Sequence, residues 1–287
     1  MKFLPTAILL LGSLLSCREL VQDNFADFEQ VPVVNSILIA NQKLTMHLSW
    51  AGKIDTTKLN IIEGATITLF ENGNILETLG YSADGIYMTD SILKPQNNYY
   101  FEAHLPGYPI ISGNENLPKP ASLVNIRHIK EAGRNAEGAI YPALTFTIEN
   151  NPQKRQYFEV VIHLLPRGQK YVAGLEKITD PLILHEGLPI ALFSNELMEG
   201  VEYEMTLNYT TNMSDGKGVT LFPLILELRS VSYNYYQFVR KVYLYEQGRY
   251  PDIFDVPVGQ GLFSNIQSGY GIFAGYSLCK SDTIFPN

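Results

Sequence analysis

Short stretches in which apolar and polar residues alternate recur along most of the chain. The clearest is 43–50 (KLTMHLSW), where every second residue is apolar. Such alternation is typical of β-strands, because successive side chains of a strand point to opposite faces. The dipeptides Asn72-Gly73 and Asp84-Gly85 each separate two runs of this kind and favour tight hairpin turns. The pattern predicts an immunoglobulin-like β-sandwich over residues 31–117.

A proline-rich segment at 117–120 (LPKP) predicts a boundary, because its two prolines remove backbone donors and stiffen the chain. Strand-like runs resume after it, and most of their connections carry Gly, Pro or Asn. We therefore predict a second β-rich domain over 121–287. No alternation of strands with helices and no internal repeat is present. The fold class expected for the whole chain is mainly β.

One amphipathic helix is predicted at about 232–247. Val231, Tyr235, Phe238 and Val242 are spaced by four, three and four residues, which places them on one helix face. Ser232 can cap the start of this helix and Gly248 fits the position just past its end. We expect the apolar face to pack on a sheet. The alternative is that tyrosines of this region contact a ligand or partner, and the candidates are Tyr233, Tyr236, Tyr243 and Tyr250.

The N-terminus has the pattern of a bacterial lipoprotein signal. Lys2 precedes a mostly apolar run from Phe3 to Leu15, which is too short to span a membrane as a helix. The run ends in Leu-Leu-Ser-Cys at 14–17, which resembles a lipobox. The resemblance implies a signal peptide over 1–16, diacylglycerol on Cys17 and a fatty acid such as palmitate on its new amine. Residues 17–30 then form a lipidated tether, since two or more acyl chains give stable anchoring.

Composition and charge narrow the possible functions. The chain has 287 residues, of which 46% are hydrophobic, and its net charge is −8. The apolar share is sufficient for packed cores. The acidic balance excludes nucleic acid as the main partner, because phosphate binding needs a basic face.

Motifs for catalysis, metals or cofactors are missing from the sequence. It contains no His-Glu-x-x-His, no Cys-x-x-Cys and no Gly-x-Ser-x-Gly. Gly269-x-Gly271-x-x-Ala274 matches the dinucleotide pattern, but it does not open a helix after a strand, so its glycines are expected to allow close packing. Asp252 and Asp255 fit a solvated loop better than an acid–base pair. We expect no enzyme activity, no catalytic residue, no metal and no cofactor.

Several segments together resemble one known family. In the second half they are 226–236 (LELRSVSYNYY), 255–258 (DVPV), 263–266 (FSNI) and 269–277 (GYGIFAGYS), and in the first half 63–73 (EGATITLFENG). In this order they are similar to a Bacteroidota outer-membrane lipoprotein family known only as a domain of unknown function. Its genes typically lie beside a TonB-dependent (SusC-like) receptor.

The resemblance implies a lipid-anchored outer-membrane subunit that docks on a SusC-like β-barrel, in nutrient import or envelope assembly. It favours the cell-surface side of that membrane over the periplasmic side. The alternative is a surface lipoprotein that binds a glycan or peptide directly, because the chain contains 18 Tyr and 14 Phe. Bacteroidota attach O-glycans at Asp-Ser/Thr sequences, and the matching residues here are Thr56, Ser91 and Thr283.

Overall fold

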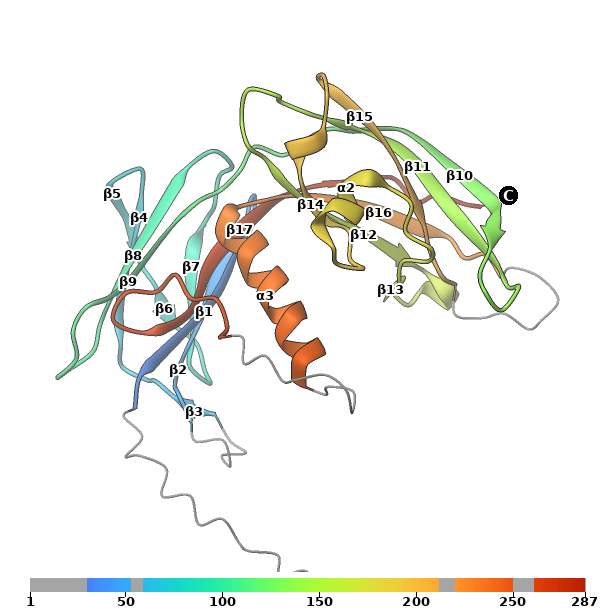
Figure 1. Cartoon of the computed structure of the whole chain (residues 1–287). Helices are drawn as coiled ribbons and strands as arrows, with labels where there is room; N and C mark the ends of the chain where they lie inside the picture. The colour runs from blue at the N-terminus through green and yellow to red at the C-terminus, as the bar shows by residue number, and fades with distance from the viewer. Residues whose placement is uncertain (1–29, 53–58, 212–219, 250–260, 287) are drawn as a thin grey trace, which may run out of the picture. The chain divides into compact units, whose positions relative to one another are not determined.

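The computed structural model describes residues 30–52, 59–211, 220–249 and 261–286 (Figure 1). The predicted signal peptide, Cys17, the tether up to residue 29, Thr56, Tyr250 and the aspartates at 252 and 255 lie outside the described residues. The described chain is mainly β, which confirms the fold class predicted from the alternating pattern. Val31–Asn287 forms one compact unit.

The largest sheet of the described residues has ten strands and connects both halves of the chain (Figure 1). Its main path runs through β13 (Tyr171–Val172), β12 (Tyr157–Leu164), β16 (Leu224–Val231), β17 (Tyr270–Lys280), β1 (Pro32–Ile39), β2 (Lys43–Trp50), β7 (Ile86–Ile92) and β6 (Gly80–Tyr81). Two short strands pair beside this path, β14 (Leu192–Ser194) with β12 and β3 (Asn60–Ile61) with β2.

Two smaller sheets pack against the ten-stranded sheet. One contains β5 (Asn74–Thr78), β4 (Thr66–Glu71), β8 (Asn98–His104) and β9 (Ile111–Asn116), and the other contains β10 (Leu123–Arg134), β11 (Ile140–Glu149) and β15 (Glu202–Asn208). Each shares a buried hydrophobic cluster with its own part of the large sheet. The chain therefore forms two sandwiches that share one sheet.

The hairpin turns of the first sandwich follow from the sequence. Asn72 and Gly73 have φ angles of 51° and 82°, and Asp84 and Gly85 have 52° and 75°. Two consecutive positive φ angles are required by the tight turns that match the twist of paired strands, and Asn, Asp and Gly tolerate them best. Both turns predicted from these dipeptides are confirmed.

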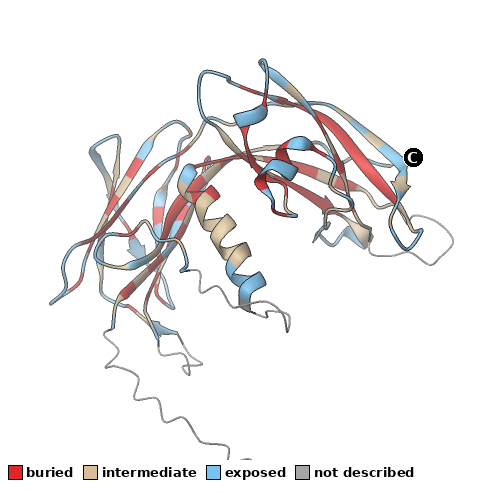
Figure 2. Ribbon diagram, in the orientation of Figure 1, coloured by how far each residue is buried: buried red, intermediate tan, exposed pale blue. Residues whose placement is uncertain are grey.

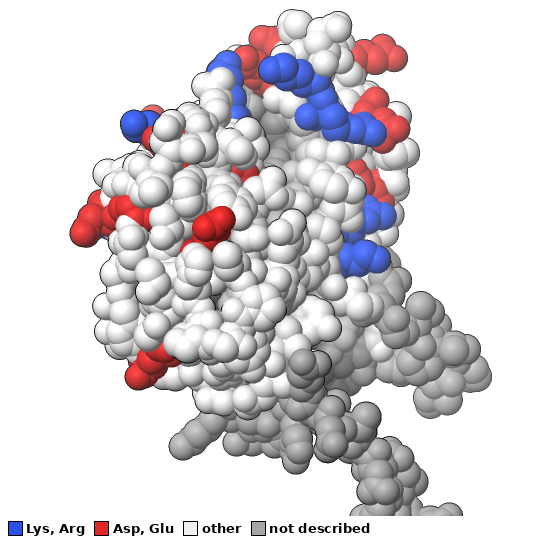
Figure 3. Space-filling model, turned by 90° about the vertical axis from the view of Figure 1, so that its left-hand side faces the viewer, with Lys and Arg blue, Asp and Glu red and all other residues white. Residues whose placement is uncertain are grey.

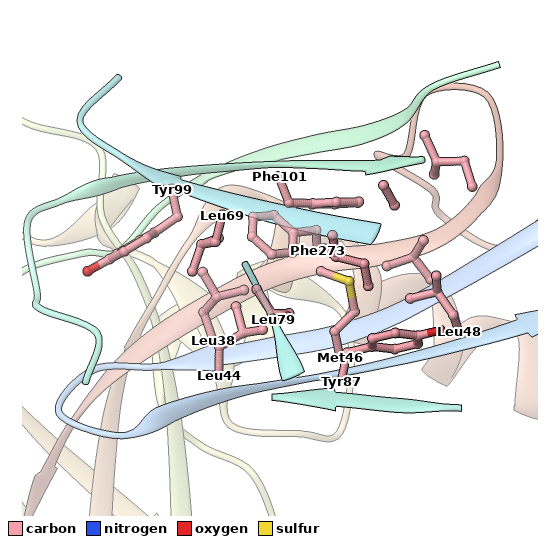
Figure 4. Packing of buried hydrophobic residues seen from close by; sticks show 14 of the residues in the cluster. Leu38, Leu44, Met46, Leu48, Leu69, Leu79, Tyr87, Tyr99, Phe101 and Phe273 are labelled. Carbon is pink, nitrogen blue, oxygen red and sulfur yellow. The ribbon is translucent and has the colours of Figure 1, made fainter. Parts of the chain in front are cut away.

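The core of the first sandwich includes a residue from the far end of the chain. Phe273 of β17 is fully buried, and its ring centroid lies 4.8 Å from that of Phe101 on β8 (Figure 4). Leu38, Met46 and Tyr87 belong to the same cluster. The boundary predicted at 117–120 separates most residues of the first sandwich's core from those of the second. The C-terminal strand β17 is the exception, because its Phe273 belongs to the first core.

β17 runs parallel to β1, from the pair Val33–Tyr270 to the pair Ile39–Tyr276. Gly271 has a φ of 111°, and a Cβ atom there would lie 1.9 Å from the carbonyl oxygen of Val34. Only glycine permits this approach. The Gly269-x-Gly271-x-x-Ala274 pattern thus serves close strand packing, as expected from the sequence.

The predicted helix is α3 (Tyr233–Arg249), and it packs on β17 (Figure 1). Ser232 caps it, since its Oγ accepts a hydrogen bond of 3.1 Å from the backbone N–H of Tyr235. Val231 and Tyr235 are buried, whereas Phe238 and Val242 are half-buried, because α3 is covered near its start and exposed near its end (Figure 2). Gly248 lies within the last turn, so its predicted position past the helix end was wrong.

The other helical segments of the described residues are short and lie in the second half. They are α2 (Pro181–Glu186) and the 3₁₀ turns η1 (Pro166–Gly168) and η2 (Asn195–Leu197). Asp180 caps α2, because its side chain accepts a hydrogen bond of 2.9 Å from the N–H of Leu182.

Candidate functional site

A cavity of about 580 Å³ lies where the proline-rich segment meets the start of α3. We call it the linker pocket. Its wall is formed by residues of 116–121, 149–151, 154–157 and 230–233, together with Gln96. The volume is in the range of pockets that hold small ligands or a short peptide segment.

The proline-rich segment that borders the pocket is fixed to the sheet. Ser230 Oγ accepts a hydrogen bond of 2.9 Å from the N–H of Ala121, and Ser277 Oγ donates one of 2.5 Å to the carbonyl oxygen of Pro118. Both serines are buried. The wall of the pocket is therefore preformed.

Aromatic rings form one side of the linker pocket. Tyr157 and Tyr233 have ring centroids 5.5 Å apart, and Tyr233 is 54% exposed. Below them, the ring of Tyr236 lies 4.7 Å from that of Tyr157 and is buried. An exposed tyrosine supported by buried rings offers a rigid face for a sugar ring or an apolar side chain.

The lining of the pocket carries mostly positive charge. Lys119, Lys154 and Arg155 line the pocket, and Glu149 is the one carboxylate among its described lining residues. Arg155 pairs with Glu196 at 2.9 Å, whereas Lys154 makes no ion pair with any described residue. In a chain of net charge −8, this local excess of cations favours an acidic or strongly polar ligand.

Glu149 is held as an ionised group. Ser122 donates a hydrogen bond of 2.7 Å to it, and Lys119 lies 3.7 Å away. The hydroxyl of Ser122 and the charge of Lys119 together lower the pKa of Glu149. Glu149 thus contributes a negative charge to the lining of the pocket.

A buried carboxyl lies under the pocket at the start of α3. Ser232 Oγ donates a hydrogen bond of 2.6 Å to Oε2 of Glu115 on β9. Glu115 is only 4% exposed, and burial raises its pKa to about 7 despite this hydrogen bond. The contact attaches the helix that carries Tyr233 to the first sandwich.

Three further hydrogen bonds attach α3 to the second sandwich. Tyr236 donates a hydrogen bond to the buried Glu186 of α2, and Arg240 donates another of 2.9 Å to the same carboxylate. Tyr235 donates one of 2.9 Å to Glu159 on β12. The first half of α3 is thus held by hydrogen bonds to both sandwiches.

A charged cluster lies on the face of the large sheet that also carries α3. It is centred on the buried Glu227 of β16. Lys170, Lys280 and Arg229 lie 2.9, 3.2 and 3.2 Å from its oxygens. Burial by itself would raise the pKa of Glu227, but hydrogen bonds from the lysines outweigh it and lower the pKa to about 2. His163 is also buried, with Nε2 3.1 Å from Glu227, and burial lowers its pKa.

The cations of this cluster stabilise the negative charge of Glu227. Its single carboxylate at the centre is surrounded by cations, and Arg229 is in turn paired with Glu159 at 2.8 Å. Among the described residues, no group of three or more His, Cys, Asp or Glu side chains is placed to hold a metal ion.

None of the helices within the described ranges is both long and apolar enough to cross a membrane.

The structure separates the site residues predicted from the sequence. Tyr233 lines the linker pocket, Tyr236 is buried against Glu186, and Tyr243 is half-buried in the second half of α3. Ser91 is half-buried in β7 and Thr283 is exposed. Cys17, Thr56 and Tyr250 lie outside the described residues.

Sequence reasoning missed several residues of this region. Tyr157, Lys154 and Glu115 come from three separate segments, and no motif links them. The one available signal was the proline-rich segment at 117–120, because a rigid connection between two packed units often borders a pocket.

Comparison with known proteins identifies the family of the chain, and the description of that family names no activity. The family model "Domain of unknown function (DUF4249)" matches residues 18–281. No curated protein matches the chain.

One similar solved structure is the crystal structure of a DUF4785 family protein from Legionella pneumophila subsp. pneumophila str. Philadelphia 1. It is 15% identical, with 70% of this chain and 52% of that chain covered and a TM-score of 0.27. The chain spans about half the length of that protein, and a likeness at this level carries no argument about fold or function.

Proposed function

The chain belongs to the DUF4249 family, and from this premise we propose that it is a lipid-anchored outer-membrane subunit that docks on a TonB-dependent (SusC-like) β-barrel. The partner would act in nutrient import or envelope assembly. The lineage we propose is Bacteroidota, where genes of this family typically lie beside such a receptor. The cell-surface side of the membrane is favoured.

The observation that carries this proposal is the lipobox at 14–17, which precedes a chain built from β-sandwiches. Lipidation of Cys17 would hold the protein at a membrane surface, where association with a membrane partner becomes favourable even for a small contact. A binding role is supported by the linker pocket, which is lined by exposed Tyr233 and by the cations Lys119, Lys154 and Arg155.

The anchor is tested by intact-mass spectrometry of protein purified from membranes. The mass should exceed that of residues 17–287 by a lipid with several acyl chains. Cys17→Ala should remove this increment and leave the precursor uncleaved at this position. A wild-type mass equal to the bare polypeptide would contradict the proposal.

The partner is tested by native purification in mild detergent, followed by mass spectrometry of every co-eluting protein. We expect a large β-barrel of the TonB-dependent class in stoichiometric amount. Tyr233→Ala should weaken co-elution, because exposed tyrosines beside cations often dominate protein interfaces. Tyr245→Ala is the matched control, since Tyr245 is 41% exposed on the second half of the same helix. Recovery of the lipoprotein alone would contradict docking.

A second function, direct binding of an acidic glycan or peptide, is favoured by one specific observation. Tyr233 and Tyr157 form an aromatic wall of the linker pocket, which Lys154 and Arg155 also line. Aromatic faces stack on sugar rings, and the cations would hold a carboxylate or sulfate group. Calorimetric titration with acidic oligosaccharides should give binding that Tyr233→Ala and Lys154→Ala abolish and Tyr245→Ala retains.

A further inference from the structure

The first sandwich has one end at which the described chain begins, and we call it the proximal end. Pro32, the first residue of β1, pairs with Trp50, the last residue of β2, and Val33 pairs with Tyr270 at the start of β17. The described chain, which begins at residue 30, therefore enters the first sandwich at this end. The connections at this end that the structure describes are 59–63, 82–85, 105–110 and 266–270.

The proximal end exposes large apolar and aromatic side chains. Leu59 is 73% exposed, Tyr270 58%, Ile110 48% and Tyr108 40%. The half-buried ring of Trp50 packs against Tyr108, with centroids 4.8 Å apart. These residues come from four separate segments, so no single strand or hairpin explains why they lie at one end.

A hollow of about 400 Å³ lies at the same end. Trp50 and Tyr108 line it together with Ile61, Leu105 and Pro106. The turns at the opposite end of the sandwich, at 40–43, 71–74 and 93–98, contain no aromatic residue. Among the described connections of this sandwich, aromatic residues are thus found at the end where the described chain begins.

Among the described connections of the proximal end, charge is sparse and acidic. These connections contain two charged residues, Glu63 and Asp84. In Figure 3, which views the molecule from the side of the first sandwich, the lower part of the described surface shows an acidic group and no Lys or Arg. The described part of this end therefore offers apolar side chains rather than cations for a membrane contact.

We infer that the proximal end rests on the lipid bilayer, with Trp50, Tyr108, Ile110 and Tyr270 in the headgroup region beside the anchor. The inference rests on the proposed lipidation of Cys17. Tryptophan and tyrosine prefer the membrane–water interface, because their rings are apolar while their polar atoms stay hydrated. The tether enters the fold at Pro32, so an anchored molecule presents this end to the bilayer more readily than any other.

The position of the tether supports a lipid surface as the occupant. Fourteen residues, 18–31, separate Cys17 from Pro32. They can extend to at most about 50 Å, so the anchor keeps the proximal end within reach of the bilayer at all times. An apolar contact made under such confinement needs little intrinsic affinity to form.

Trp50 is the single tryptophan of the chain, which makes its fluorescence a direct probe of this end. The lipidated protein is reconstituted in vesicles of phosphatidylethanolamine and phosphatidylcholine, with and without bromine on the acyl chains. We expect brominated lipid to quench Trp50 and the vesicles to shield it from acrylamide. Equal emission in both kinds of vesicle would overturn the inference.

Ile110→Asp should lower the population of the docked state by about tenfold and the quenching with it, because it places a charge where the bilayer would cover an exposed apolar side chain. Val172→Asp is the matched control, since Val172 is 66% exposed on β13, in the second sandwich. It should leave the quenching unchanged. Circular dichroism confirms that both variants are folded, and an equal effect of the two substitutions would overturn the inference.

Intact mass read on the same sample separates this inference from the proposed function. A lipid-bearing protein whose Trp50 is not quenched keeps the anchor and overturns the membrane contact. A protein without lipid overturns the anchor and the inference together. If Trp50 is shielded from acrylamide only when a β-barrel co-purifies, the proximal end contacts a protein partner. That result would overturn the lipid assignment.

Discussion

Ser232 donates a hydrogen bond of 2.6 Å to Glu115, and the two residues lie 117 positions apart in the chain. The same serine oxygen accepts the first hydrogen bond of α3, from the N–H of Tyr235. One hydroxyl therefore caps the helix and attaches it to β9 of the first sandwich. The aromatic wall of the linker pocket begins at the next residue, Tyr233.

Replacing Ser232 with alanine should destabilise the protein by about 2 to 3 kcal/mol, because it removes a helix cap and leaves the buried Glu115 with one fewer donor. Chemical denaturation of the two proteins measures the loss. Ser82→Ala is the control, since this serine is exposed and should change the free energy of unfolding by less than about 0.5 kcal/mol. A loss at Ser232 as small as the control would show that the contact contributes nothing.

Glu115 should make the protein less stable as the pH rises. Its folded pKa of about 7 exceeds the usual value of 4.5, so the unfolded state loses this proton first. The stabilising effect of the protonated carboxyl is complete below pH 4.5 and is lost as the pH rises through 7. We expect the wild type to lose about 2 kcal/mol more than Glu115→Gln between pH 5 and pH 8.

The comparison with Glu115→Gln isolates this carboxyl from the others. Glu227 has a folded pKa of about 2, below its usual value, so its contribution is lost only as the pH falls toward 2. It is present in both proteins and cancels in the difference. Parallel stability curves for the wild type and the variant from pH 5 to 8 would contradict the raised pKa of Glu115.

Phe273→Ala should cost about 3 to 5 kcal/mol, the range for truncation of a fully buried phenylalanine. Because this residue belongs to β17 and packs on Phe101, the loss should appear in the unfolding of the first sandwich, followed by Trp50 fluorescence. Phe285→Ala is the matched control, since Phe285 is 69% exposed in the C-terminal tail. An unchanged Trp50 transition in Phe273→Ala would mean that residues 31–117 fold without the last strand.

O-glycosylation, if the lineage is Bacteroidota, should be found at Thr283 before Ser91. Thr283 is exposed beyond the last strand, whereas Ser91 is half-buried in β7 and its N–H is hydrogen-bonded to Glu77. A bulky glycan needs a surface residue, so Thr283 is the better acceptor. Glycopeptide mass spectrometry of native protein tests this, with Thr283→Ala as control. Unmodified peptides covering all three predicted sites would end the proposal.

Local signals in the sequence correctly predicted the strand at 43–50, the two hairpin turns and the helix. Each depends on neighbouring residues only: alternation over 43–50, the Asn72-Gly73 and Asp84-Gly85 dipeptides, and the spacing from Val231 to Val242. The stripe was predicted as buried throughout, but Phe238 and Val242 are half-buried, because α3 extends past the edge of its sheet contact. Amphipathic spacing shows which face of a helix is apolar. It does not show how much of the helix length the neighbouring sheet covers.

The sequence by itself determined the mainly β architecture and the helix with its serine cap, because these follow from the conformational preferences and chemistry of adjacent residues. Only the tertiary structure decided that β17 completes the first sandwich, that Tyr233 faces a pocket while Tyr236 is buried, and that Glu115 lies under Ser232. Each of these pairs residues far apart in the chain. Their contact depends on strand order and register, which no local pattern specifies.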